Sequence, residues 1–170
     1  MPVRAKTIAI NLLRISLLVA IIGGGSWYFL HPKPRAPKAI KAQTSFAILL
    51  PTDPKITLSK WHYKASEKTL SFSAKVKGKE VIFTEQAAPL AYRDDQAAYD
   101  RFVGTLRPFA NFKSPLGTVS VFHLIEEGNY KPSGDSAMLL ANGTLLVAHP
   151  PEPITEDDWL TLFDTIRAER

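Results

Sequence analysis

The sequence predicts an α+β protein: an antiparallel β-sheet built from hairpins, a C-terminal amphipathic helix packed on that sheet, and one N-terminal transmembrane helix. Three observations predict this class. Residues 7–30 are almost uninterruptedly apolar, several short runs alternate between apolar and polar residues, and apolar residues recur at helical spacing after Thr155. We therefore divide the chain into a tail (1–6), an anchor (7–30), a stalk (31–44) and a small α+β domain (45–170).

The apolar stretch at residues 7–30 is long enough to cross a bilayer. Its 24 residues would extend about 36 Å as a helix, against a hydrocarbon core of ~30 Å. Arg14 lies near the start, where its side chain can reach the interface, and Trp27 and Tyr28 lie at the other end, where amphipathic rings are favoured. The lipid bilayer is thus the partner expected for this segment. A cleaved signal peptide is the alternative to this signal anchor, but no clear Ala-x-Ala site follows.

The charge of the chain is unevenly distributed. Residues 1–44 carry seven Lys and Arg and no acid, whereas the remaining 126 residues carry 14 Lys and Arg against 16 acids. The basic character therefore belongs to the anchor and stalk, and it does not favour a nucleic-acid partner for the domain. Basic residues flank the anchor almost equally on both sides, but a basic start before the first apolar run is typical of an export signal. We expect a single-pass protein of the cell membrane with an extracytoplasmic C-terminal domain.

The stalk at residues 31–44 contains Pro32, Pro34 and Pro37, four basic residues and few apolar ones. This composition is typical of an extended, semi-rigid spacer.

The domain then begins with a series of predicted strands. Residues 46–50 form a short apolar run closed by a proline, which is typical of a buried strand. Residues 69–76 alternate strictly and a Gly-containing turn joins them to a second run at 80–84, so these two form a hairpin. Another strand is expected within 116–125. An Asn-Gly pair inside residues 138–148 predicts a type I′ hairpin, because both residues tolerate positive φ.

Two helices are expected in the domain. The first spans residues 94–106 and has Ala97, Ala98, Phe102 and Leu106 along one side. The second begins at Thr155, which has the side chain of an N-cap and a carboxylate three residues later. Its apolar stripe, at the spacing of an amphipathic helix, consists of Trp159, Leu162, Phe163 and Ile166.

No motif for catalysis, metal binding or cofactor binding is present in the sequence. Cysteine is absent, which excludes disulfides, thiolate zinc sites and thiol catalysis. His31, His62, His123 and His149 are scattered, without a second ligand at metal spacing. Nucleophile, phosphate-loop and dinucleotide motifs are also missing. We therefore predict no catalytic, cofactor-binding or metal-binding residues, and we do not expect an enzyme.

The one surface that favours a partner lies in the first third of the domain. It is rich in lysine with interleaved aromatic residues, and comprises Lys55, Lys60, Trp61, Lys64, Lys68, Lys75, Lys77 and Lys79. Such a surface could bind an anionic partner, such as a cell-surface polymer or an envelope protein. The simpler interpretation is a solvated strand edge, since lysines commonly protect edge strands from pairing with other chains.

The order of these elements resembles a known group of proteins. The resemblance rests on the opening at Phe46–Pro51, the strand Val81–Gln86, Leu116-Gly117 before a strand, the Asn142–Thr144 hairpin, and the closing helix after Thr155. These pieces are similar to the C-terminal extracytoplasmic domain of uncharacterised bacterial single-pass membrane proteins, including anti-sigma-factor-like ones. The resemblance implies an extracytoplasmic α+β domain without catalytic residues. Only six residues precede the anchor, too few for the sigma-binding helices of such proteins.

Taken together, these features predict a membrane-anchored, non-enzymatic binding or sensing module. Two alternatives remain open. One is a carrier of a lipid or other hydrophobic ligand, whose candidate lining residues are Phe72, Phe83, Phe102, Phe109, Phe112 and Trp159. The other is a cell-envelope enzyme with a site too dispersed along the chain to recognise.

Overall fold

The computed structural model describes residues 34–125 and 132–170. The expected anchor, with Arg14, Trp27 and Tyr28, lies outside these residues. Within the described ranges, no helix is sufficiently long and apolar to span a bilayer.

A seven-stranded sheet forms the centre of the described domain, with the strand order β2-β3-β4-β8-β7-β6-β5. In chain order the strands are β2 (Thr57–Lys64), β3 (Thr69–Val76), β4 (Lys79–Ala87), β5 (Ala110–Ser114), β6 (Gly117–Ile125), β7 (Pro132–Ala141) and β8 (Thr144–His149). Two further strands, β1 (Ile48–Pro51) and β9 (Ile166–Glu169), pair with each other in a separate sheet. All neighbouring strands in both sheets are antiparallel. The predicted α+β class with an antiparallel sheet is therefore confirmed.

Local turn chemistry determines two of the hairpins. Asn142 and Gly143 have φ values of 50° and 74°, as the predicted type I′ turn between β7 and β8 requires. Lys77 and Gly78, with φ values of 47° and 87°, make a similar turn between β3 and β4. Because successive side chains of a strand point to opposite faces, these turns also fix which residues enter the core.

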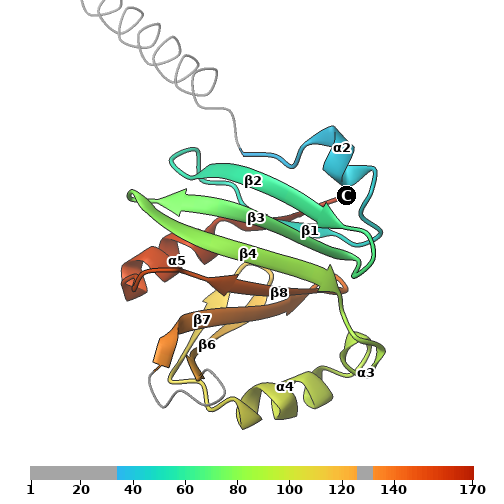
Figure 1. Ribbon diagram of the computed structural model, residues 1–170. Helices are drawn as coiled ribbons and strands as arrows, with labels where there is room; N and C mark the ends of the chain where they lie inside the picture. The colour runs from blue at the N-terminus through green and yellow to red at the C-terminus, as the bar shows by residue number, and fades with distance from the viewer. Residues whose placement is uncertain (1–33, 126–131) are drawn as a thin grey trace, which may run out of the picture. The chain divides into compact units, whose positions relative to one another are not determined.

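The main core lies on one face of the sheet, the inner face, beneath α5 (Glu156–Asp164) and the β1–β9 pair. Thr155 and Asp158 form a capping box that starts α5, and Trp159, Leu162 and Phe163 are buried, as predicted. In Figure 1, β1 and α5 lie behind the strands β3, β4 and β8. Buried inner-face side chains from the strands include Leu70, Phe72, Val81, Phe83, Val121, Leu139 and Leu146.

A second, smaller core lies on the outer face of β6, β7 and β8. There α4 (Gln96–Thr105), preceded by the short α3 (Leu90–Arg93), covers Phe122, Met138 and Leu145. On the outer face of β2, β3 and β4, every second residue in the middle of β4 is exposed, including Ile82 and Thr84. The structure therefore leaves a polar sheet surface on the half of the sheet that carries the lysines.

Several predicted elements differ from the structure. The C-terminal helix ends at Asp164, and Ile166, predicted on its stripe, is instead the first residue of β9, where it pairs with Pro51. This pairing joins residues more than a hundred positions apart, so no local pattern announces it. The predicted apolar side of α4 is confirmed in part: Phe102 and Leu106 pack against the smaller core, but the fully buried residues are Tyr99 and Val103, and Ala97 is exposed. Large side chains fill the space above the sheet better than the two alanines do.

Several short or irregular elements were not predicted, among them β2, β5 and α2 (Lys38–Lys41). The bulge in β2 interrupts its alternation of apolar and polar residues, and β5 is only five residues long. Within the expected stalk, Lys38–Lys41 form the helix α2, so the extended conformation does not hold there. Ala36 is buried and Ile40 packs against the main core. The second half of the expected spacer thus contributes to the folded domain.

The side chain of Glu85, on β4, connects the two sheets. It is fully buried, and its carboxylate oxygens accept hydrogen bonds from the backbone N–H of Leu49 at 3.1 and 3.2 Å. Burial raises the pKa of Glu85 well above its usual range, and the hydrogen bond from Leu49 only partly opposes this effect. The strand β1 is therefore held against the large sheet by a carboxyl group that is easier to bury in its neutral form.

Candidate functional site

The predicted lysine surface follows β2, β3 and β4, and several of its lysines have carboxylate partners. Lys60 Nζ lies 2.6 Å from Glu80 Oε1, and Lys64 pairs with Glu67. Lys77 and Lys79 lie 3.2 and 3.5 Å from the carboxylate of Asp158, at the start of α5. Lys55, Lys68 and Lys75 form no ion pair within the described part of the chain. Part of the positive charge therefore organises the domain itself.

The best-developed site on this surface is a pocket of about 430 Å³ that we call the lysine pocket. Its walls come from the outer face of β2, β3 and β4 and from the loop after β8. The lining residues are Ser59, Lys60, Ser73, Lys75, Gly78, Lys79, Glu80, Pro151 and Glu152. The register places Ser59 opposite Ser73 and Lys75 opposite Glu80, so the pocket is built on regular sheet geometry. Of the predicted residues, only Lys60, Lys75 and Lys79 line this pocket.

A β-bulge in β2 brings Lys60 to this pocket. Leu58 and Trp61 are an odd number of residues apart, yet both pack against the main core. Regular alternation would place them on opposite faces, and the register shift between Ser59 and His62 resolves the conflict. Lys60 is the inserted residue, with a φ of 56°, a left-handed conformation that costs a non-glycine residue about 1 kcal/mol. Its ammonium group reaches Glu80 on the outer face.

The carboxylate of Glu80 is held ionised by this arrangement. The hydrogen bond from Lys60 lowers the pKa of Glu80, and a hydrogen bond from Ser73 contributes in the same direction. At the neighbouring helix start, burial alone would raise the pKa of Asp158, but its bonds to Thr155 and Lys77 lower it to about 2. Glu80 and Asp158 are therefore ionised at neutral pH. The lysine pocket itself is lined by three lysines and two acidic residues, Glu80 and Glu152.

Trp61 packs against the main core, unlike the lysines that precede and follow it in the sequence. Its ring stacks on Phe72 with the centroids 4.4 Å apart, and Phe72 stacks in turn on Phe83 at 5.1 Å. The half-buried tryptophan thus closes one side of the core, and the outward-facing residue next to it is His62.

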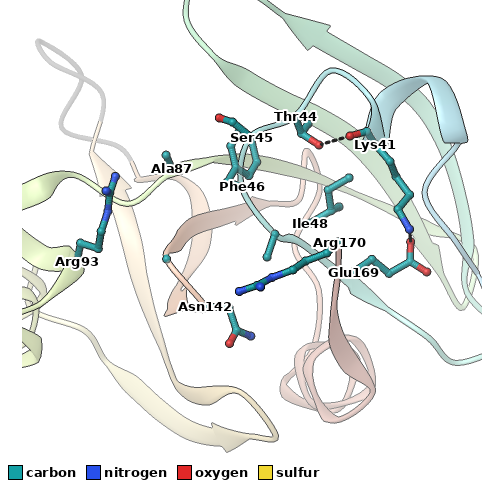
Figure 2. Close-up of a pocket in the computed structure, with 12 residues that line it drawn as sticks. Lys41, Thr44, Ser45, Phe46, Ile48, Ala87, Arg93, Asn142, Glu169 and Arg170 are labelled. Atoms are coloured by element: carbon teal, nitrogen blue, oxygen red, sulfur yellow. Dashed lines mark hydrogen bonds and ion pairs between the residues drawn. The ribbon is translucent and has the colours of Figure 1, made fainter.

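A larger pocket, of about 640 Å³, lies at the end of the domain where β9 finishes (Figure 2). Separate segments contribute Lys41, Arg93, Asn142 and Arg170, which no sequence pattern brought together. We call it the arginine pocket. A carboxylate side chain at its wall, Glu169, accepts a hydrogen bond from the backbone N–H of Ala36 at 3.1 Å. The close-up also shows Lys41 directed toward Glu169, at 3.9 Å.

Two of the three histidines in the described ranges, His123 and His149, each pair with one polar side chain. His123 Nδ1 lies 2.7 Å from Asp135 Oδ1, and its ring stacks on the exposed ring of Phe109. His149 Nδ1 lies 3.0 Å from the hydroxyl of Ser136, which is fully buried. None of these four residues lines the lysine pocket or the arginine pocket. Across residues 34–125 and 132–170, no group of three or more potential metal ligands occurs.

The aromatic residues considered for a hydrophobic carrier are distributed over several places. Phe72, Phe83 and Trp159 are buried in the main core, and Phe112 packs against it. Phe102 packs against the smaller core beneath α4, whereas Phe109 is exposed. These rings pack on protein atoms and on one another and do not line the two pockets.

Comparisons with models of protein families, with curated proteins and with solved structures give no match for this chain.

Proposed function

We propose that this protein is a membrane-anchored, non-enzymatic binding module whose extracytoplasmic domain binds an anionic surface polymer through the lysine pocket. The observation that carries the proposal is the bulge at Lys60. A strained residue in the middle of a strand is retained where the surrounding structure compensates for it, and such residues cluster at functional sites. Here the strained residue directs an ammonium group into a pocket that already contains two other lysines.

The chemistry of the pocket fits a phosphate- or carboxylate-bearing chain. Lys75 has no acid within ion-pair distance among the described residues, and Ser59 adds a hydroxyl donor. An incoming anion can compete with Glu80 for Lys60, because both side chains are accessible to solvent and exposed ion pairs are weak. The expected affinity is modest and sensitive to salt, since screening weakens interactions between exposed charges.

The position of β2 at the edge of the sheet favours a second role for the same lysines, which is to hinder pairing with another chain. Protection of an edge requires charge along the strand but no particular pocket. The two roles therefore differ in how strongly they depend on the position of each lysine.

The test measures the binding of the full chain, in a neutral-lipid nanodisc, to poly(glycerol phosphate) at low salt, with dextran as the uncharged control polymer. Lys60→Gln and Lys75→Gln are each expected to weaken binding by about threefold to fivefold, equivalent to at most ~1 kcal/mol. Lys68→Gln removes the same charge from the β2–β3 turn and is the matched control. Equal losses from all three variants would indicate edge protection and general charge, and would refute a specific pocket.

The proposed topology has its own test. Protease treatment of intact cells that express a C-terminally tagged protein should remove the tag, because the domain is expected outside the membrane. Protection of the tag in intact cells, together with cleavage after lysis, would place the domain in the cytoplasm and would exclude a cell-surface polymer as its partner.

A further inference from the structure

The arginine pocket is assembled from parts of the chain that are far apart in sequence. Lys41 comes from the segment before β1, Arg93 from the end of α3, Asn142 from the β7–β8 turn, and Arg170 from the residue after β9. Its volume of about 640 Å³ lies within the range of ligand-binding pockets. Figure 2 shows the guanidinium group of Arg170 extending toward the side of the pocket where Asn142 lies.

Positive side chains outnumber negative ones in this pocket. Lys41, Arg93 and Arg170 line it, and among its lining side chains only Glu169 carries a carboxylate. This carboxylate is already engaged by the backbone of Ala36 and by Lys41. Neither arginine forms an ion pair within the described residues. The two guanidinium groups therefore retain most of their capacity to bind an anion.

Arg93 is held in place without losing that capacity. Its Nη2 donates a hydrogen bond to the carbonyl oxygen of Ala88 at 3.3 Å, which fixes the side chain beside the end of β4. A guanidinium group has five N–H donors, so one bond to a carbonyl leaves the others available. The amide of Asn142 can add further donors, and its backbone is fixed by the type I′ turn.

We propose that the arginine pocket binds a phosphate group. The planar fork of arginine matches the oxygens of a phosphate and can donate two parallel hydrogen bonds to it. Two arginines and an amide suit a tetrahedral anion with several acceptor oxygens better than a singly charged carboxylate, while Lys41 offsets the charge of Glu169. Among the residues that line the pocket, only Phe46 and Ile48 have large apolar side chains. The recognised part of the ligand is therefore the phosphate itself, with a small polar group attached.

Two sources could present such a group: a phospholipid headgroup or a soluble phosphomonoester. The lipid source rests on the proposed membrane anchor. Ten residues separate position 30 from Lys41, and even a fully extended chain of that length reaches only about 35 Å. The experiment therefore tests a lipid headgroup as well as a soluble phosphomonoester.

The experiment titrates glycerol 3-phosphate into the full chain in a zwitterionic detergent and follows binding by calorimetry, with glycerol as the control without phosphate. Arg93→Gln and Arg170→Gln should each weaken binding about tenfold, equivalent to ~1.4 kcal/mol, because each removes a charged hydrogen-bond donor. Arg101→Gln, an exposed arginine on α4 outside the pocket, is the matched control and should bind like the wild type. Thermal unfolding of every variant verifies that it is folded.

Two outcomes would overturn the proposal: no saturable binding of glycerol 3-phosphate, or equal affinity in the wild type and both pocket variants. Vesicles then separate the sources. Binding to phosphatidate in a phosphatidylcholine vesicle that depends on both arginines supports a lipid headgroup, whereas phosphate binding without vesicle binding supports a soluble ligand. Lys60→Gln should retain phosphate binding, so failure of the lysine pocket and failure of the arginine pocket are distinguishable.

Discussion

The buried carboxyl group of Glu85 should make the stability of the domain depend on pH. Glu85 is fully buried between Leu70 on β3 and Leu146 on β8, its partners in register, and the backbone N–H of Leu49 donates a hydrogen bond to it. No lysine or arginine within the described chain lies in ion-pair distance of it. Burial consequently raises its pKa well above the usual value of 4.5.

The direction of the effect follows from proton linkage. Above about pH 4.5 the unfolded chain releases the proton of Glu85, while the folded chain keeps it until the raised pKa is reached. The stabilising contribution of the protonated group is therefore complete at low pH and is lost as pH rises. Between about pH 4.5 and the raised pKa of Glu85, the free energy of unfolding should fall by up to ~1.4 kcal/mol per pH unit relative to a protein without this carboxyl group.

The variant Glu85→Gln removes the titration while keeping an oxygen that can accept the hydrogen bond from Leu49. Urea unfolding of wild type and variant at a series of pH values gives the difference in their free energies of unfolding, in which other titrating groups cancel. This difference should move in favour of the variant as pH rises from 4.5 toward neutrality. Glu67→Gln, at an exposed position, controls for the loss of one acidic group. A difference for Glu85→Gln that stays constant across this range would refute the reasoning.

Two further predictions concern single positions in the domain. Tyr99→Phe should leave the free energy of unfolding unchanged or raise it by about 1 kcal/mol, because the buried hydroxyl of Tyr99 has no hydrogen-bond partner among the described residues. A loss above about 1 kcal/mol in urea unfolding would show that the hydroxyl has a partner. Gly143→Ala should lower the free energy of unfolding by about 1 kcal/mol, because φ at Gly143 is +74°. Gly104→Ala, in α4, should instead raise the free energy of unfolding by ~0.5–1 kcal/mol. An added Cβ meets no atom within 4 Å at either glycine, so equal effects in the two variants would contradict the backbone explanation.

The parts of the fold that could be predicted are those encoded by local chemistry. Asn142-Gly143 forms the expected turn because few other residue pairs tolerate two positive φ values in succession. The start of α5 follows from Thr155 and Asp158, which satisfy each other's backbone N–H groups. The strand β3 was evident because its alternation is uninterrupted from Thr69 to Val76.

The parts that could not be predicted depend on distant partners. The bulge at Lys60 reverses the faces to which alternate residues of β2 point. The apolar residues on either side of the bulge therefore do not follow one alternating pattern in the sequence. Glu85 shares the inward face of β4 with Val81 and Phe83, but only the docking of β1 reveals which group satisfies its buried carboxylate. Likewise, the arginine pocket exists only after Arg93 and Arg170 have been brought together by folding. Candidate sites of this kind need three-dimensional structure, since no motif in the sequence contains them.

The strain at Lys60 can itself be tested against the binding that we propose for it. Lys60→Gly removes the cost of a positive φ, about 1 kcal/mol, and also the exposed ion pair with Glu80, which contributes little because solvent screens it. The free energy of unfolding should therefore change little or increase slightly, while the affinity for poly(glycerol phosphate) falls. Lys68, with a φ of 51° in the β2–β3 turn, provides the matched control, since Lys68→Gly relieves similar strain outside the lysine pocket. It should stabilise the domain by about 1 kcal/mol and leave polymer binding unchanged. If Lys60→Gly binds the polymer as well as the wild type does, the bulge serves only to direct Trp61 into the core, and the strained lysine has no part in recognition.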